Sequence, residues 1–258
     1  MTVQAAGRGN PKINLSDGHE LLTSYVGPQE LSNALQQNLA EPLSLASADF
    51  DEDGVPDLVS GYAYDGRGII TLHRGNVDSI YPNAPEAKQR KADGTFTAAP
   101  FLSPGRVFDA RVAADFLAAG DFDADGHFDL AAAGRGNGVL LFFAGDGHGG
   151  FAEAREISLP GTVTALTTGE VNRADGLTDV VVGVTNELGS TVLVFEGPNG
   201  SLKAQPEILT MPGTVTALAV GQLDQDELGS GADGQLRQRI PWPRFAGGTG
   251  EVIQNNFT

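Results

Sequence analysis

The chain has 258 residues, of which 40 % are hydrophobic, and a net charge of −17. This hydrophobic share supports a packed core and excludes a disordered polar chain, whereas the negative charge argues against nucleic-acid binding and docking on anionic lipid. The absence of cysteine excludes disulfides and thiolate metal sites. The 35 glycines and 14 prolines, together with few helical patterns, favour an all-β chain with many tight turns.

The chain carries no sign of a targeting or membrane segment. No run of about 18 apolar residues occurs, so we expect no membrane insertion. The opening residues, MTVQAAGRGNPK, lack the apolar stretch of a signal peptide. We therefore expect either an intracellular protein or a chain whose true N-terminus is missing.

The first segment, 1–41, precedes the main pattern of the chain. Within it, residues 28–41 predict a short amphipathic helix that has three leucines on one side, Leu31, Leu35 and Leu39. Residues 5–10 (AAGRGN) recur as residues 132–137. The segment is thus either a decoration of the main domain or the remnant of an earlier repeat unit.

An internal repeat runs through residues 42–228. Residues 160–166 (PGTVTAL) recur unchanged as residues 212–218, and the residues that follow, 166–170 and 218–222, have looser copies at 45–49 and 117–121. Each unit contains an apolar strand, an acidic turn, two further apolar strands and a weaker fourth strand. Four strands in about 50 residues fit one blade of a β-propeller. We predict an all-β fold, a partial β-propeller of about three to four four-stranded blades with calcium-binding turns.

The apolar runs of the repeat are nearly continuous, which is typical of strands buried between stacked sheets. The second strand is expected at 58–61, 130–133 and 180–183, and the third at 69–73, 139–143 and 191–195. The first unit is longer because it contains an insertion at about 76–111. Its part 82–99, rich in Pro, Ala, Lys and Arg, predicts an exposed loop.

Two turns share the pattern D-x-D-x-D-G-x-x-D. Their carboxylates are Asp49, Asp51, Asp53 and Asp57 in the first turn, and Asp121, Asp123, Asp125 and Asp129 in the second. Carboxylates at alternate positions repel each other unless a cation lies between them, and calcium takes six to eight oxygen ligands. The glycine at position 6 permits a sharp turn, and position 7 offers the backbone carbonyls of Val55 and His127. These turns predict two calcium sites.

Other interpretations of these turns fit less well. An EF-hand needs glutamate at position 12 and flanking helices, whereas position 12 is Ser60 in the first turn and Ala132 in the second. Magnesium prefers fewer protein oxygens and keeps its waters. An ordinary Asx-rich hairpin turn would explain one copy of the pattern but not two copies in register with a repeat.

A third turn, 170–179, departs from the pattern by one extra residue and by two replacements of Asp. Its ligands would be Glu170, Asn172, Asp175 and Asp179, whose oxygens still suit calcium, so a third site is predicted. At 222–226 the pattern is lost, and we predict no site there.

The cage D-x-D-x-D-G-x-x-D followed by an apolar strand, with Phe50 and Phe122 between the first two aspartates, resembles the FG-GAP or VCBS repeats of integrin-α-like propellers. The resemblance covers about 42–223. It implies structural calcium at the residues named above, and an extracellular or cell-surface protein whose signal peptide is missing from this chain. Residues 229–258, including RQRIPWPR, are unlike the repeat, so we expect a truncated, frame-disturbed or disordered tail.

Three functions remain open from the sequence. The first is a calcium-binding module for an extracellular protein or carbohydrate, within a larger multidomain chain, with the insertion as its best candidate surface. The second is the propeller part of a secreted lyase or hydrolase. However, the four histidines form no metal motif and no G-x-S-x-G sequence occurs, so we predict no catalytic residues. The third is a structural spacer in a surface protein.

Overall fold

The computed structural model describes residues 2–4, 12–14, 23–171 and 177–220. The predictions for Asn172, Asp175, the turn at 222–226 and the tail 229–258 lie outside these residues. Near the start of the chain, β1 (Thr2–Gln4) pairs antiparallel with β2 (Lys12–Asn14).

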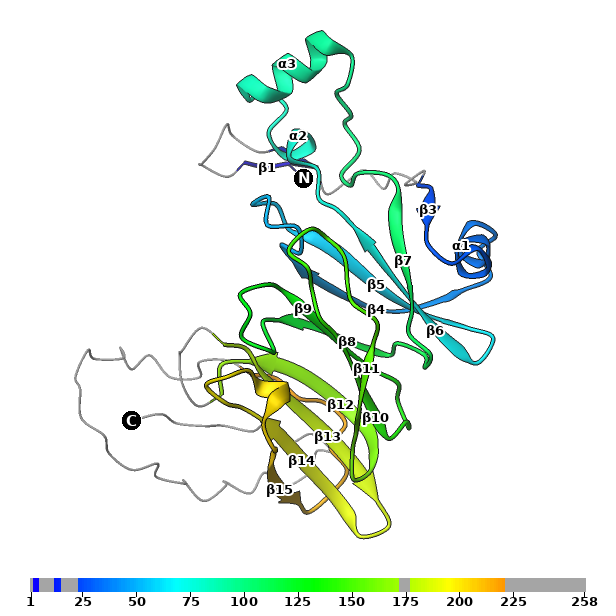
Figure 1. Ribbon diagram of the computed structural model, residues 1–258, viewed down its shortest axis with the longest axis vertical. Helices are drawn as coiled ribbons and strands as arrows, with labels where there is room; N and C mark the ends of the chain where they lie inside the picture. The colour runs from blue at the N-terminus through cyan, green and yellow to red at the C-terminus, as the bar shows by residue number, and fades with distance from the viewer. Residues whose placement is uncertain (1, 5–11, 15–22, 172–176, 221–258) are drawn as a thin grey trace, which may run out of the picture.

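Three larger sheets follow one another along the chain and along the long axis of the molecule (Figure 1). The first contains β4 (Glu41–Ala48), β5 (Asp57–Tyr64), β6 (Arg67–His73) and β7 (Gly105–Asp109). The second contains β8 (Phe116–Gly120), β9 (Asp129–Ala133), β10 (Val139–Phe143) and β11 (Arg155–Ser158). The third contains β12 (Thr162–Gly169), β13 (Asp179–Asn186), β14 (Gly189–Phe195) and β15 (Glu207–Met211).

Within each sheet these four strands lie side by side in chain order and run antiparallel. The prediction of a mostly β chain built from four-stranded units is therefore confirmed, as are the expected second strands (β5, β9 and β13) and third strands (β6, β10 and β14).

The middle sheet is buried on both faces, which explains its continuous apolar sequence. Side chains alternate between the two faces of a strand. In β10, Leu141 and Phe143 join the core shared with the first sheet, whereas Leu140 and Phe142 join the core shared with the third sheet. All five residues of β9 are buried. Burial of apolar area on both faces is thus what stacks the three sheets.

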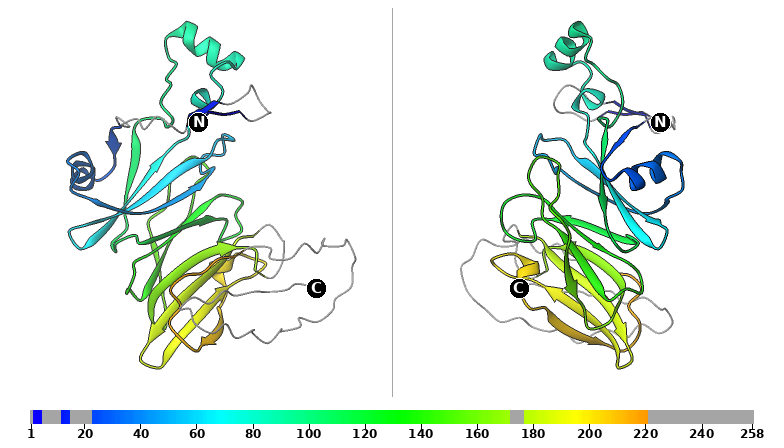
Figure 2. Two further views of the ribbon diagram at one scale, coloured as in Figure 1. Left: turned by 180° about the vertical axis from the view of Figure 1, so that it is seen from behind. Right: turned by 45° about the vertical axis from the view of Figure 1, so that its right-hand side comes forward.

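A helix covers the outer face of the first sheet. Leu31 and Leu35 of α1 (Gln29–Gln36) pack with Ile69 and Val107 of the sheet, and β3 (Tyr25–Val26) adds a parallel fifth strand beside β7 (Figure 2). The predicted helix is confirmed, but the prediction that Leu39 lies on its apolar side was wrong. The helix ends at Gln36, and Leu39 is 59 % exposed.

The outer face of the third sheet is covered by the second copy of PGTVTAL. Val215, from this copy, lies in a cluster with Val181 of β13 and Val192 of β14. The first copy, by contrast, begins β12. The second copy forms no strand with the described part of the chain, yet it takes part in the core through the same apolar positions.

The insertion was predicted to form an exposed loop at 82–99, which is wrong for 85–93. It contains α2 (Val77–Ile80) and α3 (Pro85–Asp93), which project away from the sheets (Figure 2). Proline is well suited to the first turn of a helix and glycine to the left-handed position after its end. Pro85 and Gly94, with a φ of 73°, occupy these places in α3.

An ion pair joins the two helices of the insertion. Asp78 of α2 is buried, and Arg90 of α3 donates to both of its carboxylate oxygens, with Nε 2.6 Å from Oδ2. This hydrogen bonding holds the pKa of Asp78 below its usual value. A bridge between Gly75 and Phe101 closes the base of the insertion. The range 76–111 was too long, because β7 lies within it and completes the first sheet.

The remaining helix is η1 (Ser201–Lys203), a single 3-10 turn between β14 and β15. Across the described ranges, no helix has the length and apolar character needed to cross a bilayer.

Replacing Leu141 by alanine tests the stacking of the first and second sheets. Leu141 is fully buried in their shared core, so Leu141→Ala is expected to lower the free energy of unfolding by about 2–5 kcal/mol. Leu188→Ala is the matched control, because Leu188 is 97 % exposed and should change it by less than about 0.5 kcal/mol. Urea unfolding measures both, and equal effects of the two variants would contradict the stacked core.

Candidate metal centres

The three acidic turns occupy the same place in the three sheets, between the first and second strands. Residues 49–57 join β4 to β5, residues 121–129 join β8 to β9, and residues 170–179 join β12 to β13. The sequence repeat is therefore a repeat of position as well as of composition.

The last aspartate of each turn is buried at the start of the second strand and clamps the turn. It accepts a hydrogen bond from the second residue of its own turn and, in the first two sheets, from the glycine that lies two residues beyond the third strand. The contacts are Phe50 N and Gly75 N to Asp57 (3.0 and 2.7 Å), Phe122 N and Gly145 N to Asp129 (2.8 and 2.9 Å), and Val171 N to Asp179 (2.8 Å).

Burial dominates the acid–base behaviour of this clamp. Removing a carboxylate from water disfavours its charged form, and this desolvation raises the pKa of Asp57 and of Asp129 to about 6, although their N–H donors act in the opposite direction. The neighbouring carboxylates act on the pKa of both groups in the same direction as desolvation. A bound cation would remove this conflict by favouring the charged form.

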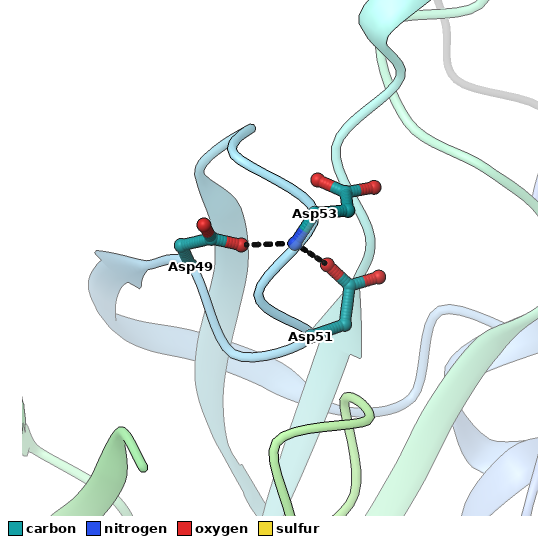
Figure 3. A group of neighbouring side chains, drawn as sticks. All are labelled: Asp49, Asp51 and Asp53. Atoms are coloured by element: carbon teal, nitrogen blue, oxygen red, sulfur yellow. Dashed lines mark hydrogen bonds between the residues drawn. The ribbon is translucent and has the colours of Figure 1, made fainter. Parts of the chain in front are cut away.

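The first aspartate of each turn shapes the loop around it. Asp49 accepts hydrogen bonds from Asp53 N (3.1 Å) and Gly54 N (2.9 Å), the first of which Figure 3 shows. Asp121 accepts the corresponding bonds from Asp125 N (3.2 Å) and Gly126 N (3.0 Å). The glycines have φ of 85° and 90°, a region that favours glycine, so the predicted role of position 6 in the sharp turn is confirmed.

Carboxylate oxygens converge in both turns. In the first, oxygens of Asp49, Asp51 and Asp53 all lie within 4.8 Å of one another (Figure 3). In the second, the corresponding group is Asp121, Asp123 and Asp129. The structure thus brings together three of the four predicted aspartates of each turn. Asp57 lies outside the first group as the clamp of its turn, and Asp125 lies outside the second, where it accepts from His127 N at 2.9 Å.

The donor set fits a hard divalent cation. All converging atoms are carboxylate oxygens. Calcium and magnesium prefer such oxygen ligands, whereas softer metals prefer sulfur or nitrogen. Asp123, a member of the second group, has one oxygen, Oδ1, that is buried and has no hydrogen-bond partner among the described residues. A buried polar atom without a partner is costly, and a cation in the group would satisfy it.

The third turn is only partly described. Glu170 is exposed, whereas Asp179 is buried at the start of β13. Because Asn172 and Asp175 lie outside the described residues, the third site stays a prediction. The backbone carbonyls of Val55 and His127 likewise remain predicted ligands.

Two contacts around the turns were missed by sequence reasoning. His127 Nδ1 lies 2.5 Å from Glu52 Oε1, which joins the second turn to the first. Arg74, directly after β6, forms an ion pair with Asp51 and places its second guanidinium nitrogen 3.8 Å from Asp53 Oδ2. The sequence does hold one signal for Arg74. The residue before the glycine that follows the third strand is Arg74 in the first unit, but Ala144 and Glu196 in the next two.

One cavity of about 810 Å³ lies between the second and third sheets on the side of β11 and β15. Its lining combines apolar side chains with two cationic ones, and includes Ile157, Leu193, Phe195, Leu202, Arg155 and Lys203.

Comparison with known proteins adds little to this picture. No family model matches the chain, and no curated protein matches it. Among solved structures, the crystal structure of BBS1N in complex with ARL6DN, soaked with mercury, is similar over 86 % of this chain and 67 % of that chain, with 16 % identity and a TM-score of 0.34. A TM-score this low does not establish a shared fold.

The raised pKa values of Asp57 and Asp129 predict an unusual pH dependence in metal-free buffer. Between the ordinary value of 3.8 and about 6, the folded chain holds protons that the unfolded chain has released. The contribution of these groups to the free energy of unfolding is therefore largest below the ordinary pKa, and it is lost as the pH rises through 6.

Urea unfolding between pH 5 and 7 measures this effect. Asp129→Asn should flatten the decline in stability by removing one of these two groups, whereas Asp65→Asn, at an exposed position outside the acidic turns, should leave it unchanged. A decline that persists fully in Asp129→Asn would contradict the assignment.

Proposed function

We propose that the chain is a calcium-stabilised β-propeller segment of the FG-GAP and VCBS type, which serves as a binding or scaffolding module. The observation that carries the proposal is the buried, unpartnered Asp123 oxygen within a group of three carboxylates. No N–H donor among the described residues satisfies this atom. A divalent cation satisfies it and neutralises the repulsion within the group.

The arrangement of the sheets supports a propeller. Each sheet has four antiparallel strands in chain order, and the first strands β4, β8 and β12 are neighbours from one sheet to the next. Propeller blades have this strand order and place their first strands side by side around a common axis. In this proposal the three sheets are consecutive blades, and the segment 212–220 belongs to the beginning of another.

Calcium fits the turns better than magnesium. Magnesium demands a near-ideal octahedron and keeps several waters, whereas calcium accepts more protein oxygens in irregular arrangements. At an extracellular concentration of about 1 mM and a Kd of about 0.1–1 mM, each occupied site adds roughly 0.4–1.4 kcal/mol to the stability of the fold. Calcium is structural in this proposal, and the protein works outside the cell or on its surface.

The ligand of the module is an extracellular protein or carbohydrate. The cavity beside β11 and β15 offers apolar side chains together with Arg155 and Lys203, and the insertion offers the exposed α3. A protein or glycan array would separate a binding module from a spacer. A binding module should bind a member of the array and lose that binding when one of these two surfaces is changed, whereas a spacer should bind nothing.

Asp123→Asn is expected to gain less stability from calcium than the wild type does. In metal-free buffer the substitution removes a buried charge that lacks a partner. The free energy of unfolding of the variant should therefore equal that of the wild type or be higher by up to about 1–3 kcal/mol. In millimolar calcium it loses a ligand, so its gain should be smaller than that of the wild type by roughly 0.4–1.4 kcal/mol. Thermal unfolding by circular dichroism measures both.

Magnesium and a surface variant provide the controls for this experiment. Magnesium should raise the melting temperature less than calcium does. Asp65→Asn, in the exposed turn between β5 and β6, should show the full calcium gain. The proposal fails if wild type and Asp123→Asn gain equally from calcium, or if neither gains.

A further inference from the structure

We propose that the guanidinium of Arg74 competes with calcium for the carboxylates of the first acidic turn, so that this turn binds calcium more weakly than the second. The inference rests on the proposed function, because it concerns the relative affinity of the two calcium turns. It assigns a role to a residue outside the acidic motif.

Arg74 is placed among the carboxylates that would hold the ion. Its Nε donates to Asp51, and its second terminal nitrogen lies 3.8 Å from Asp53 Oδ2. Both aspartates belong to the group of oxygens that converge within 4.8 Å. The Asp51 side chain is only 3 % exposed, so the guanidinium takes up a carboxylate that water does not reach.

The surroundings of Arg74 hold it in this position. Its neighbour Gly75 donates to the buried clamp Asp57 at 2.7 Å, which fixes the backbone on the C-terminal side of Arg74. A glycine of the β10–β11 turn packs from the other side: a Cβ on Gly149 would lie 3.4 Å from Asp51 Cβ and 3.7 Å from the Arg74 stem. The backbone N–H of Gly149 also donates a hydrogen bond to Phe50 O at 3.0 Å. The second sheet therefore confines the ion pair of the first.

The second turn has the same framework without the cation. Gly145 donates to the clamp Asp129 as Gly75 does to Asp57, and the residue before Gly145 is Ala144. Asp123, the counterpart of Asp51, keeps a buried oxygen without a partner. Lys203 donates only to the backbone carbonyl of Asp123, and no ion pair joins it to these carboxylates within the described ranges.

The two turns thus differ in the cation beside their second aspartate, whereas the additional carboxylate of the first turn, Glu52, contacts His127 of the second. A unit positive charge a few ångströms from the site opposes a divalent cation by Coulomb repulsion, and it also occupies a ligand that the ion needs. We expect the first turn to bind calcium about tenfold or more weakly than the second. In the absence of calcium, Arg74 neutralises the first turn, whereas the second has no such partner.

Calcium titration followed by NMR resolves the two turns separately. The amides of Gly54 and Gly126 donate to Asp49 and Asp121, so each reports on its own turn. In the wild type, Gly126 should saturate at about tenfold lower calcium than Gly54. Arg74→Gln should bring the two midpoints together, whereas Arg74→Lys, which keeps the charge, should leave them apart. The reciprocal change Ala144→Arg should weaken the second turn.

Thermal unfolding supplies an independent readout. In metal-free buffer, Arg74→Gln should lower the melting temperature, because it leaves Asp51 buried and unpaired, and calcium should restore it. Equal midpoints for Gly54 and Gly126 that Arg74→Gln does not change would overturn the role of Arg74 but leave the calcium module intact. No response of either glycine to calcium, in any variant, would instead overturn the proposed function together with this inference.

Discussion

The buried aspartate at the start of each second strand is the contact on which the rest of the structure depends. Asp57 ties together three strand ends, because it receives one N–H from the residue that follows β4 by two positions and another from the residue that follows β6 by two. Asp129 repeats the arrangement in the second sheet. A carboxylate suits this place since it accepts two bonds at once, and burial makes each bond stronger than in water. The cost is a charge in an apolar setting, which raises its pKa.

Because the clamp fixes the same backbone path in successive sheets, the side chains around it vary independently. The glycine donor beyond the third strand is shared by the first two sheets, but the residue before it is Arg74 in one and Ala144 in the other. Similarly, the five-residue stretch 146–150 of the second sheet is replaced by the insertion in the first, and an isolated bridge closes both connections at their base. The repeat preserves a framework and varies the charge and the loops that it carries.

Sequence periodicity was sufficient for features set within one unit. The strands and the position-6 glycines follow from local pattern, because alternation and left-handed φ are properties of neighbouring residues. The helices of the insertion were missed, since Asp78 and Arg90 are far apart in a segment whose composition is typical of a loop. Arg74 and the Glu52–His127 contact were missed for a related reason. Each depends on how side chains from separate loops come together after the chain has folded, and the pattern of the acidic motif does not contain that information.

The acidic turns are also part of the core between the sheets, which would link the proposed ion binding to stacking. Phe50 stands between Asp49 and Asp51, is fully buried with the second sheet, and lies 5.2 Å from the Phe151 ring between centroids. Phe122 has the same position in the second turn and is buried in the core shared with the third sheet. Its carbonyl accepts a hydrogen bond from Leu202 N at 3.2 Å. A residue with a carboxylate on each side and a core beneath it transmits repulsion from the turn into the interface. Neutralising the turn, by Arg74 or by calcium, should therefore stabilise the contact between neighbouring sheets as well as the loop itself.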